Sequence, residues 1–121
     1  MIYKNTQLKI ADNTGPKKAK CINISKKKIG YLADLLVIAI KKKFIKRKKI
    51  KKNILLSTLI TSKKKQKRLD GNFIMFNNNK IVLLDEKLNF LGTNLKSLIC
   101  KEYKKNKKKN LKLISYSRGN I

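Results

Sequence analysis

Short apolar runs separated by turn residues divide most of the chain. The clearest are Leu55 to Thr61, Phe73 to Phe76 and Ile81 to Leu84, which are separated by the turns Asp70-Gly71 and Asn77-Asn78-Asn79. Runs of four to eight apolar or β-branched residues between such turns are typical of antiparallel strands. The pattern therefore predicts an antiparallel β meander with a strongly basic loop, SKKKQKR, at one hairpin end.

Two more strands are predicted near the start of the chain. One begins at Leu8 to Ala11 and ends at the turn-rich segment Asp12 to Pro16. The other covers Ala19 to Ser25, where alternation directs Ala19, Cys21 and Ile24 toward the core. The alternation slips at Ile22, so either one face is misassigned or the strand carries a bulge.

The middle of the chain adds a strand from Asp34 to Ile40, whose continuous apolar character suits a strand buried on both faces or in a closed barrel. The basic segment Lys41 to Lys52 is compatible with a helix or an extended hairpin arm, but its few apolar residues have poor helical spacing, so an exposed loop is preferred.

Near the C-terminus, four apolar residues predict one face of a short helix, and Leu111 to Tyr116 predicts a last short strand. The residues of the helical face are Leu95, Leu98, Ile99 and Tyr103. The residues expected to form the core are Ile10, Cys21, Leu36, Ile38, Leu56, Ile60, Phe73 and Val82.

The composition adds an extreme positive charge. The 121 residues include 33 Lys and Arg against 6 Asp and Glu, a formal charge of +27. Such a charge repels itself and implies a polyanionic partner, while the apolar runs argue against disorder for most of the chain. The length suits one domain, 1–121, with a helical and basic extension from about residue 95. Lys, Ile and Asn are products of A/T-rich codons, so codon bias and selection for binding both remain possible sources of the Lys excess.

Enzymatic and metal-dependent functions lack suitable residues. There is no His, the commonest general base, and the few carboxylates are scattered, so no catalytic residue and no metal ligand set is predicted. Cys21 and Cys100 are expected to be buried thiols, and no cofactor is implied. The start of the chain has no signal-peptide pattern and the longest apolar run, 35–40, is too short to span a membrane, so no membrane association is expected.

Nucleic-acid binding fits the distribution of the cations. They cluster in predicted loops, where a rigid β scaffold would hold them against phosphates. Aromatic residues form no stacking platform, so binding to folded RNA by shape and phosphate contact is favoured. A free, nucleoid-type DNA-binding protein is the alternative, and a cationic membrane-surface module is a third, disfavoured reading. The clusters are Lys17-Lys18, Lys26 to Lys28, Lys41 to Lys52, Lys63 to Arg68 and Lys104 to Lys109.

An ordered set of motifs over the whole chain resembles ribosomal large-subunit protein fourteen, the universal L-fourteen family in its bacterial and organellar type. It begins with Met1-Ile2 and the run Ala11 to Gly15. The most specific part is Asp70-Gly71, then Phe76, then Ile81 to Leu84. The chain departs from the family pattern at Ala33, where the family has Gly, and at Asn94, where it has Arg. The remaining matches are Lys17-Lys18, Cys21-Ile22, Asp34, Ile50 to Lys52, Asn78 or Asn79, Gly92-Thr93 and Glu102.

The resemblance implies a mainly β fold, a small five-stranded antiparallel β-barrel with a short C-terminal helical segment. It implies a structural role in the large ribosomal subunit, with large-subunit rRNA, ribosomal proteins three and nineteen, and small-subunit rRNA at an intersubunit bridge as partners. A ribosome silencing factor binds one surface of bacterial and organellar members. The composition suggests an A/T-rich organellar genome, in a relict plastid or a mitochondrion, rather than a reduced bacterial endosymbiont.

The charge clusters and the resemblance together assign three groups of residues. Those predicted to bind rRNA are Lys17, Lys18, Lys48, Lys49, Lys51, Lys52, Lys63, Lys64, Lys65, Lys67, Arg68 and Asn78. Those predicted at the bridge are Lys41, Lys42, Lys43 and Lys46. The protein-partner surface is predicted at Thr93, Asn94 and Lys101.

Overall fold

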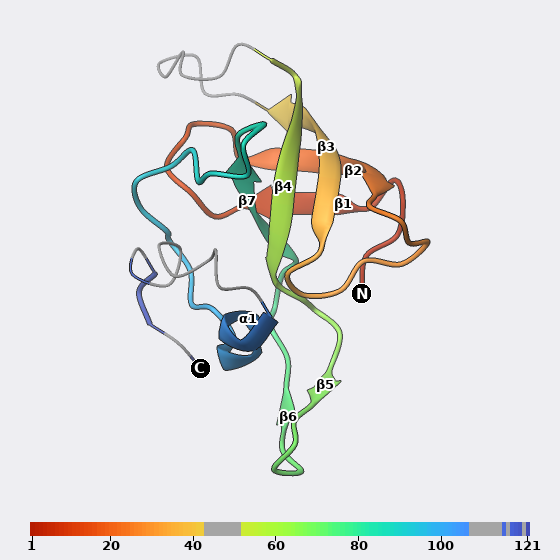
Figure 1. Ribbon diagram of the computed structural model, residues 1–121, viewed down its shortest axis with the longest axis vertical. Coiled ribbons are helices and arrows are strands. Elements are labelled where there is room, and N and C mark those ends of the chain that lie inside the picture. The colour runs from red at the N-terminus through yellow and green to blue at the C-terminus, as the bar shows by residue number, and fades with distance from the viewer. Residues whose placement is uncertain (43–51, 107–114, 116, 120) are drawn as a thin grey trace.

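Five strands form a closed barrel in the computed structural model of the chain (Figure 1). The structure describes residues 1–42, 52–106, 115, 117–119 and 121. The predicted fold class, a mainly β barrel with a short C-terminal helix, is confirmed. The strands, in their order around the barrel, are β1 (Gln7–Ile10), β2 (Lys18–Ile24), β3 (Leu35–Lys42), β4 (Ile54–Thr61) and β7 (Lys80–Leu84).

The barrel closes through one parallel pairing. β1 to β4 pair with their sequence neighbours and β4 pairs with β7, all antiparallel, whereas β7 runs parallel to β1. The barrel is therefore antiparallel at every junction except this one. The parallel junction places Lys9 opposite Lys80 and Ile10 opposite Ile81.

The segment between β4 and β7 leaves the barrel as a two-stranded arm, here defined as residues 63–77. Its strands are β5 (Gln66–Lys67) and β6 (Phe73–Ile74), and it extends away from the barrel in Figure 1. The prediction that Phe73 to Phe76 is a strand of the meander beside β7 was wrong, because β4 pairs directly with β7. The predicted turn at Asp70-Gly71 is confirmed at the tip of the arm.

The bulge predicted in the second strand is present. The pairing of β2 with β3 shifts register between Cys21 and Asn23, which leaves Ile22 without a partner and 42% exposed. Cys21 and Ile24, on either side of the shift, are both buried. The extra residue lets β2 bend around the barrel while both apolar side chains stay inside.

Two apolar clusters fill the molecule. The first lies inside the barrel and includes Cys21, Leu36 and Ile38. The second covers the outside of β4 and β7, where Ile60 and Val82 pack against the C-terminal segment through Tyr103. The predicted core therefore forms two clusters, because β4 and β7 are buried on both faces.

Three members of the predicted core are not fully buried. Phe73 is 56% exposed, since it lies on the arm rather than in the barrel. Leu56 is only half-buried. Ile10 is also half-buried, but its side chain packs against the barrel interior.

The helix α1 (Lys101–Asn106) begins later than the sequence predicted. Leu95 is in an isolated bridge with Asp12, and the Lys96 amide donates to the Ala11 carbonyl, so this backbone is extended. Leu95, Ile99 and Tyr103 are buried as predicted, but Leu98 is 38% exposed. Most of the predicted loop 41–52 and of the predicted strand 111–116 lies outside the described residues. In the part of the chain that the structure describes, no helix is long and apolar enough to cross a membrane.

The turn at the tip of the arm gives a test of the fold. Gly71 has φ of +86°, a left-handed conformation that a β-branched residue adopts only with strain. Gly71→Val should lower the free energy of unfolding by about 1–2 kcal/mol, measured by urea denaturation. Gly71→Asn is the matched control and should stay close to wild type, since Asn tolerates this conformation. Wild-type stability of the Val variant would contradict the turn assignment.

Candidate nucleic-acid interface

Lysines from adjacent barrel strands stand side by side at one place on the wall. In the strand pairing, Lys80 of β7 is opposite Lys9 of β1, and Lys9 is opposite Lys18 of β2. The next strand continues the row, because Lys18 is opposite Lys42 of β3. Adjacent strands lie about 4.8 Å apart, so the row spans roughly 15 Å of backbone. We call Lys80, Lys9, Lys18 and Lys42 the lysine row.

Three lysines of the row, Lys9, Lys18 and Lys80, form no ion pair with a carboxylate among the described residues. The ion pairs found there are Lys27 with Asp34, Lys52 with Glu86, and Arg68 with Glu102. The Lys80 ammonium instead contacts the Ser97 hydroxyl at 3.4 Å. Like charges on directly opposite strand positions are destabilising, so the barrel keeps an uncompensated repulsion at this place. A bound polyanion would relieve it.

A surface groove of about 680 Å³ runs beside the lysine row. Its apolar lining comes from Ile10, Ala11 and Pro16, at the end of β1 and in the following turn. A second, smaller cavity of about 240 Å³ shares Lys9 and Lys18 with it. The cations that line the larger groove are Lys9, Lys17, Lys18, Lys80 and Lys96. The smaller cavity is lined by Gln7, Leu8, Lys9, Lys18, Lys63, Asn77, Asn78 and Asn79.

The structure brings four of the predicted rRNA-binding residues together at these two cavities, namely Lys17, Lys18, Lys63 and Asn78. They come from the β1–β2 turn, from the base of the arm and from the turn before β7. The Lys63 amide donates to the Asn79 side-chain oxygen at 2.8 Å, and the Thr61 hydroxyl donates to the Asn78 carbonyl at 2.9 Å. These contacts hold the two sides of the arm's base together.

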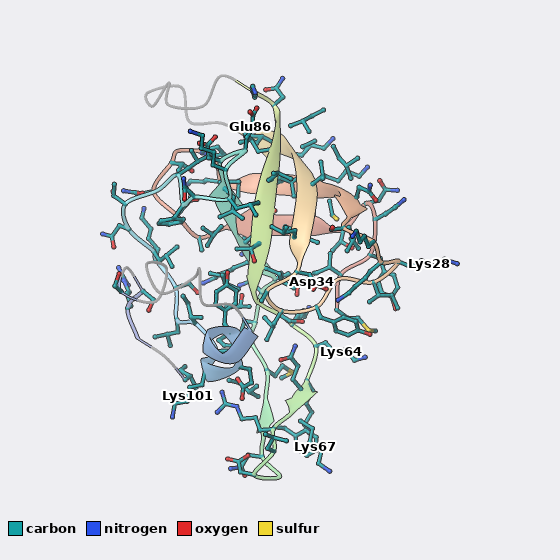
Figure 2. The ribbon with its side chains drawn as sticks, viewed as in Figure 1. Lys28, Asp34, Lys64, Lys67, Glu86 and Lys101 are labelled. Atoms are coloured by element: carbon teal, nitrogen blue, oxygen red, sulfur yellow. The ribbon has the colours of Figure 1, made fainter. Side chains whose placement is uncertain are left out.

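The arm carries four more of the predicted cations, Lys64, Lys65, Lys67 and Arg68. Lys64 and Lys67 are exposed, and Figure 2 shows Lys67 near the far end of the arm. The Lys65 ammonium lies 4.3 Å from the centre of the Phe73 ring, across the β5–β6 pair, in a cation–π contact. The arm therefore carries lysines on a β hairpin that stands clear of the barrel.

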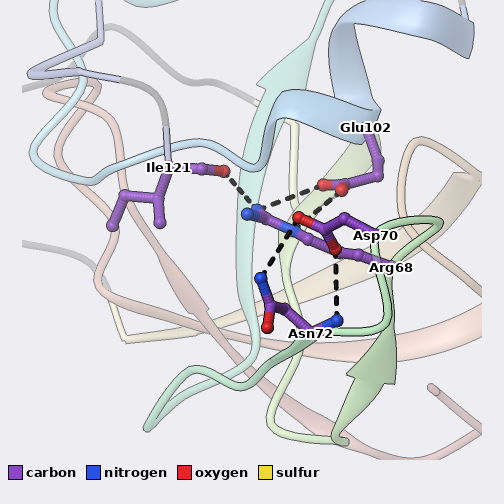
Figure 3. Close-up of polar contacts among 5 residues, drawn as sticks. All are labelled: Arg68, Asp70, Asn72, Glu102 and Ile121. Atoms are coloured by element: carbon purple, nitrogen blue, oxygen red, sulfur yellow. Dashed lines mark hydrogen bonds and ion pairs between the residues drawn. The ribbon is translucent and has the colours of Figure 1, made fainter.

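Arg68 has an intramolecular partner instead of an open position. Its Nε lies 2.8 Å from Glu102 Oε1, and its Nη2 also donates to the Ile121 carbonyl (Figure 3). The side chain is only 19% exposed. In the turn beside it, Asp70 accepts hydrogen bonds from the Asn72 amide and side chain. Arg68 thus ties the arm to α1, and its predicted role in rRNA binding stays a prediction.

Eight predicted cations belong to the end of β3 and to the basic segment that follows it. Lys41 is exposed at the end of β3, and Lys42 occupies its register position. Lys52 is exposed and pairs with Glu86. The hydrogen bond to Glu86 and the negative charge of Glu86 favour the charged form of Lys52 and raise its pKa. The predicted residues Lys43, Lys46, Lys48, Lys49 and Lys51 lie outside the described part of the chain.

The predicted protein-partner surface is fixed by one asparagine. The Asn13 side chain accepts from the amides of Thr93 and Asn94, at 3.0 and 3.4 Å, and donates to the Thr93 hydroxyl. Gly92 permits this approach, because a Cβ there would lie 3.0 Å from Asn13 Oδ1 and 3.1 Å from Asp12 Cβ. Thr93 and Asn94 are exposed, and Lys101 is exposed at the start of α1.

The two cysteines and the carboxylates are the other candidates for chemistry. Cys21 and Cys100 are buried free thiols, as predicted. Burial raises the pKa of the Cys100 thiol to about 11, so it stays protonated at neutral pH. Within the described ranges, His, Cys, Asp and Glu side chains form no group that could hold a metal ion.

Comparison with known proteins identifies the family of the chain. The sequence model of the family described as ribosomal protein L14p/L23e matches residues 1–120. The chain belongs to this family. A relative from Carsonella ruddii (strain PV), named large ribosomal subunit protein uL14, is 37% identical over 120 residues, covering 97% of each chain. The family resemblance read from the motifs is thereby confirmed.

Three lysines of the candidate interface were not predicted from the sequence. Lys9, Lys80 and Lys96 line the larger groove but were not predicted, because cations were expected in loops. Lys9 lies between the apolar residues Leu8 and Ile10, so strand alternation already placed it on the outer face. What alternation could not show is that Lys80, 71 positions away, becomes its neighbour in the sheet.

Proposed function

We propose that this L14-family chain is a structural constituent of the large ribosomal subunit that binds large-subunit rRNA with the lysines of the arm and the barrel wall. The observation that carries the proposal is the lysine row, where like charges occupy opposite positions on adjacent strands and Lys9, Lys18 and Lys80 form no ion pair among the described residues. Phosphate contacts made by cations on a rigid scaffold are the main source of affinity for nucleic acid. The family name and the relative's name support the ribosome as the setting.

Protein and rRNA partners beyond the large-subunit rRNA follow from the family resemblance. They are small-subunit rRNA at a bridge near Lys41 to Lys46, and ribosomal proteins three and nineteen as neighbours. The surface of Thr93, Asn94 and Lys101 is proposed for a protein partner, with a silencing factor as the candidate. Its support here is the rigid, exposed loop held by Asn13. The role proposed is structural rather than catalytic.

The cellular setting is proposed from composition. The abundance of Lys, Ile and Asn supports an A/T-rich genome, in a relict plastid or a mitochondrion. The similarity to a bacterium with a reduced genome favours the alternative, a bacterial endosymbiont. In either setting, the same electrostatic argument for rRNA applies.

Replacing the lysines of the arm tests rRNA binding. Ala at Lys63, Lys64, Lys65 and Lys67 should weaken binding to large-subunit rRNA and flatten its dependence on salt. Each lost phosphate contact reduces the slope of log K against log salt by about 0.7–0.9, so four contacts would reduce it by roughly 3. Filter binding of the purified chain at several salt concentrations measures this slope.

The matched control replaces four exposed lysines elsewhere, Lys4, Lys26, Lys28 and Lys87. Lys28 projects from a loop far from the arm in Figure 2. Both variants lose the same charge, so a larger change of slope in the arm variant shows a local contact. Equal changes in the two variants would contradict a specific role for the arm.

A further inference from the structure

The larger groove combines an apolar floor with surrounding lysines. Ala11 and Pro16 are buried and Ile10 is half-buried, and all three line the groove. Lysines stand on both sides: Lys9 and Lys80 come from the barrel wall, and Lys96 from the segment before α1. A surface that contacted phosphates alone would need the cations but not the apolar floor.

We propose that this groove binds an unpaired nucleotide of RNA, with its base over the floor of Ile10, Ala11 and Pro16 and its flanking phosphates on the surrounding lysines. The proposal rests on the proposed function for RNA as the ligand, and it adds the state of the RNA and the residues that hold it. A base has two apolar faces, so its transfer from water onto such a floor is favourable. Unstacked bases of loops and bulges are the parts of RNA that proteins take into pockets.

The dimensions and the charge favour an unpaired strand over a duplex. A volume of about 680 Å³ lies within the usual range of about 300–1,000 Å³ for pockets that enclose small organic ligands. In a duplex the bases are stacked and paired, so the floor would stay unfilled while only the rim was used. Lys9 and Lys18 also line the smaller cavity, so one strand can continue from the first cavity into the second.

The smaller cavity supplies amide groups for the continuing strand. Asn77 and Asn78 line it next to Lys63. A carboxamide offers both a donor and an acceptor, which suits base edges and the ribose 2′-hydroxyl. Thr61 and Lys63 hold this turn through the Asn78 carbonyl and the Asn79 side chain, so the amides are presented on a fixed backbone.

Three RNA probes of equal phosphate number test the proposal on the full-length chain. They are a short single strand, the same strand with abasic sites, and a hairpin duplex, with binding followed by fluorescence anisotropy. Wild-type protein should bind the single strand about tenfold more tightly than the abasic strand, because the abasic strand lacks the apolar base faces that the floor would remove from water. Equal binding of these two strands would overturn the role of the apolar floor.

A pair of charge-matched variants locates the site. Lys9→Gln, Lys18→Gln and Lys96→Gln remove three charges at the groove, and Lys4→Gln, Lys28→Gln and Lys87→Gln remove three elsewhere. The groove variant should lose at least about tenfold more affinity for the single strand than the control variant, and this difference between the variants should be smaller on the duplex, which can contact the lysines but not the floor. Equal losses on the single strand would overturn the proposed site.

The two proposals fail in different ways. If the wild-type chain sediments with large subunits while the groove variant binds every probe as the control does, only the nucleotide site is wrong. If the wild-type chain is absent from large subunits, the proposed ribosomal function is wrong whatever the probes show.

Discussion

Tyr103→Ala should lower the free energy of unfolding by about 3–5 kcal/mol, the largest effect expected of any substitution in α1. The Tyr103 side chain is fully buried and joins α1 to the outer face of β4 and β7. Its hydroxyl donates to Thr58 Oγ1 at 3.2 Å. Removal of the ring leaves a cavity among Ile60, Val82 and Ile99, and it also leaves the Thr58 hydroxyl without this partner. Thermal or urea denaturation measures the loss.

Tyr103→Phe is the conservative control and separates the ring from the hydroxyl. It keeps the packed ring, so it should cost only about 1 kcal/mol at neutral pH for the lost hydrogen bond. A loss as large as that of the Ala variant would contradict the cavity explanation, because the ring would then contribute little.

Comparison of wild type with Tyr103→Phe should also show a pH dependence of the free energy of unfolding. Burial raises the pKa of Tyr103 to about 12, from an ordinary value of 10.0, although the Thr58 hydrogen bond acts in the opposite direction. Above pH 10 the unfolded phenol loses its proton while the folded one keeps it, so stability falls as the pH rises through the folded pKa of about 12. Two pKa units correspond to about 2.7 kcal/mol. Wild type should lose roughly this much more than Tyr103→Phe between pH 9 and pH 12, and parallel curves would contradict the burial of the hydroxyl.

Asp12→Ala is expected to cost about 2 kcal/mol and to loosen the groove's edge. The Asp12 carboxylate is buried and accepts hydrogen bonds from the Leu83 amide, at 3.1 Å, and from the amide and hydroxyl of Thr14. Burial raises the pKa of Asp12, which shows that desolvation outweighs these bonds for the charged form. Ala relieves that desolvation but leaves the buried Leu83 amide unpaired, and the unpaired donor costs about 1–3 kcal/mol.

Asp12→Asn is the graded control. Its single carbonyl oxygen can accept from Thr14 or from Leu83 but not serve both sides, so its stability should lie between those of wild type and Asp12→Ala. Hydrogen exchange at the Leu83 amide gives the local measure, and exchange should be faster in both variants. Unchanged protection of this amide would contradict the assigned hydrogen bond.

Local turn chemistry explains why most strands could be predicted from the sequence. Asp70-Gly71 and the slip at Ile22 each specify a backbone feature within a few residues, and both are present. Ala33 shows the same principle: it has φ of +66°, a conformation most easily adopted by the Gly that the family uses there.

The predictions that were wrong depend on contacts between residues far apart in the sequence. Phe73 lies in an apolar run that is typical of a core strand. The structure places it on the arm, where its ring contacts Lys65 instead of the core. Leu95 has helical spacing to Ile99, yet its backbone pairs with Asp12 and stays extended. Neither pairing leaves a signal near these residues in the sequence.

Lysines of the candidate interface that belong to basic runs could be predicted from the sequence. Lysines that are brought together only by strand pairing could not. Lys17, Lys18 and Lys63 lie in basic runs and could be found in the sequence. Lys9 and Lys80 are isolated cations next to apolar residues, and they become a site only when β7 closes the barrel against β1. Barrel closure thus places Lys80 opposite Lys9.

Sucrose-gradient sedimentation of a source lysate at moderate salt, with quantitative detection of this chain, tests the central claim most directly. The ribosomal assignment predicts one copy per large subunit and per whole ribosome, with little chain elsewhere. Sedimentation with DNA, or only in the slow fractions free of subunits, would contradict it and favour a free nucleic-acid-binding protein.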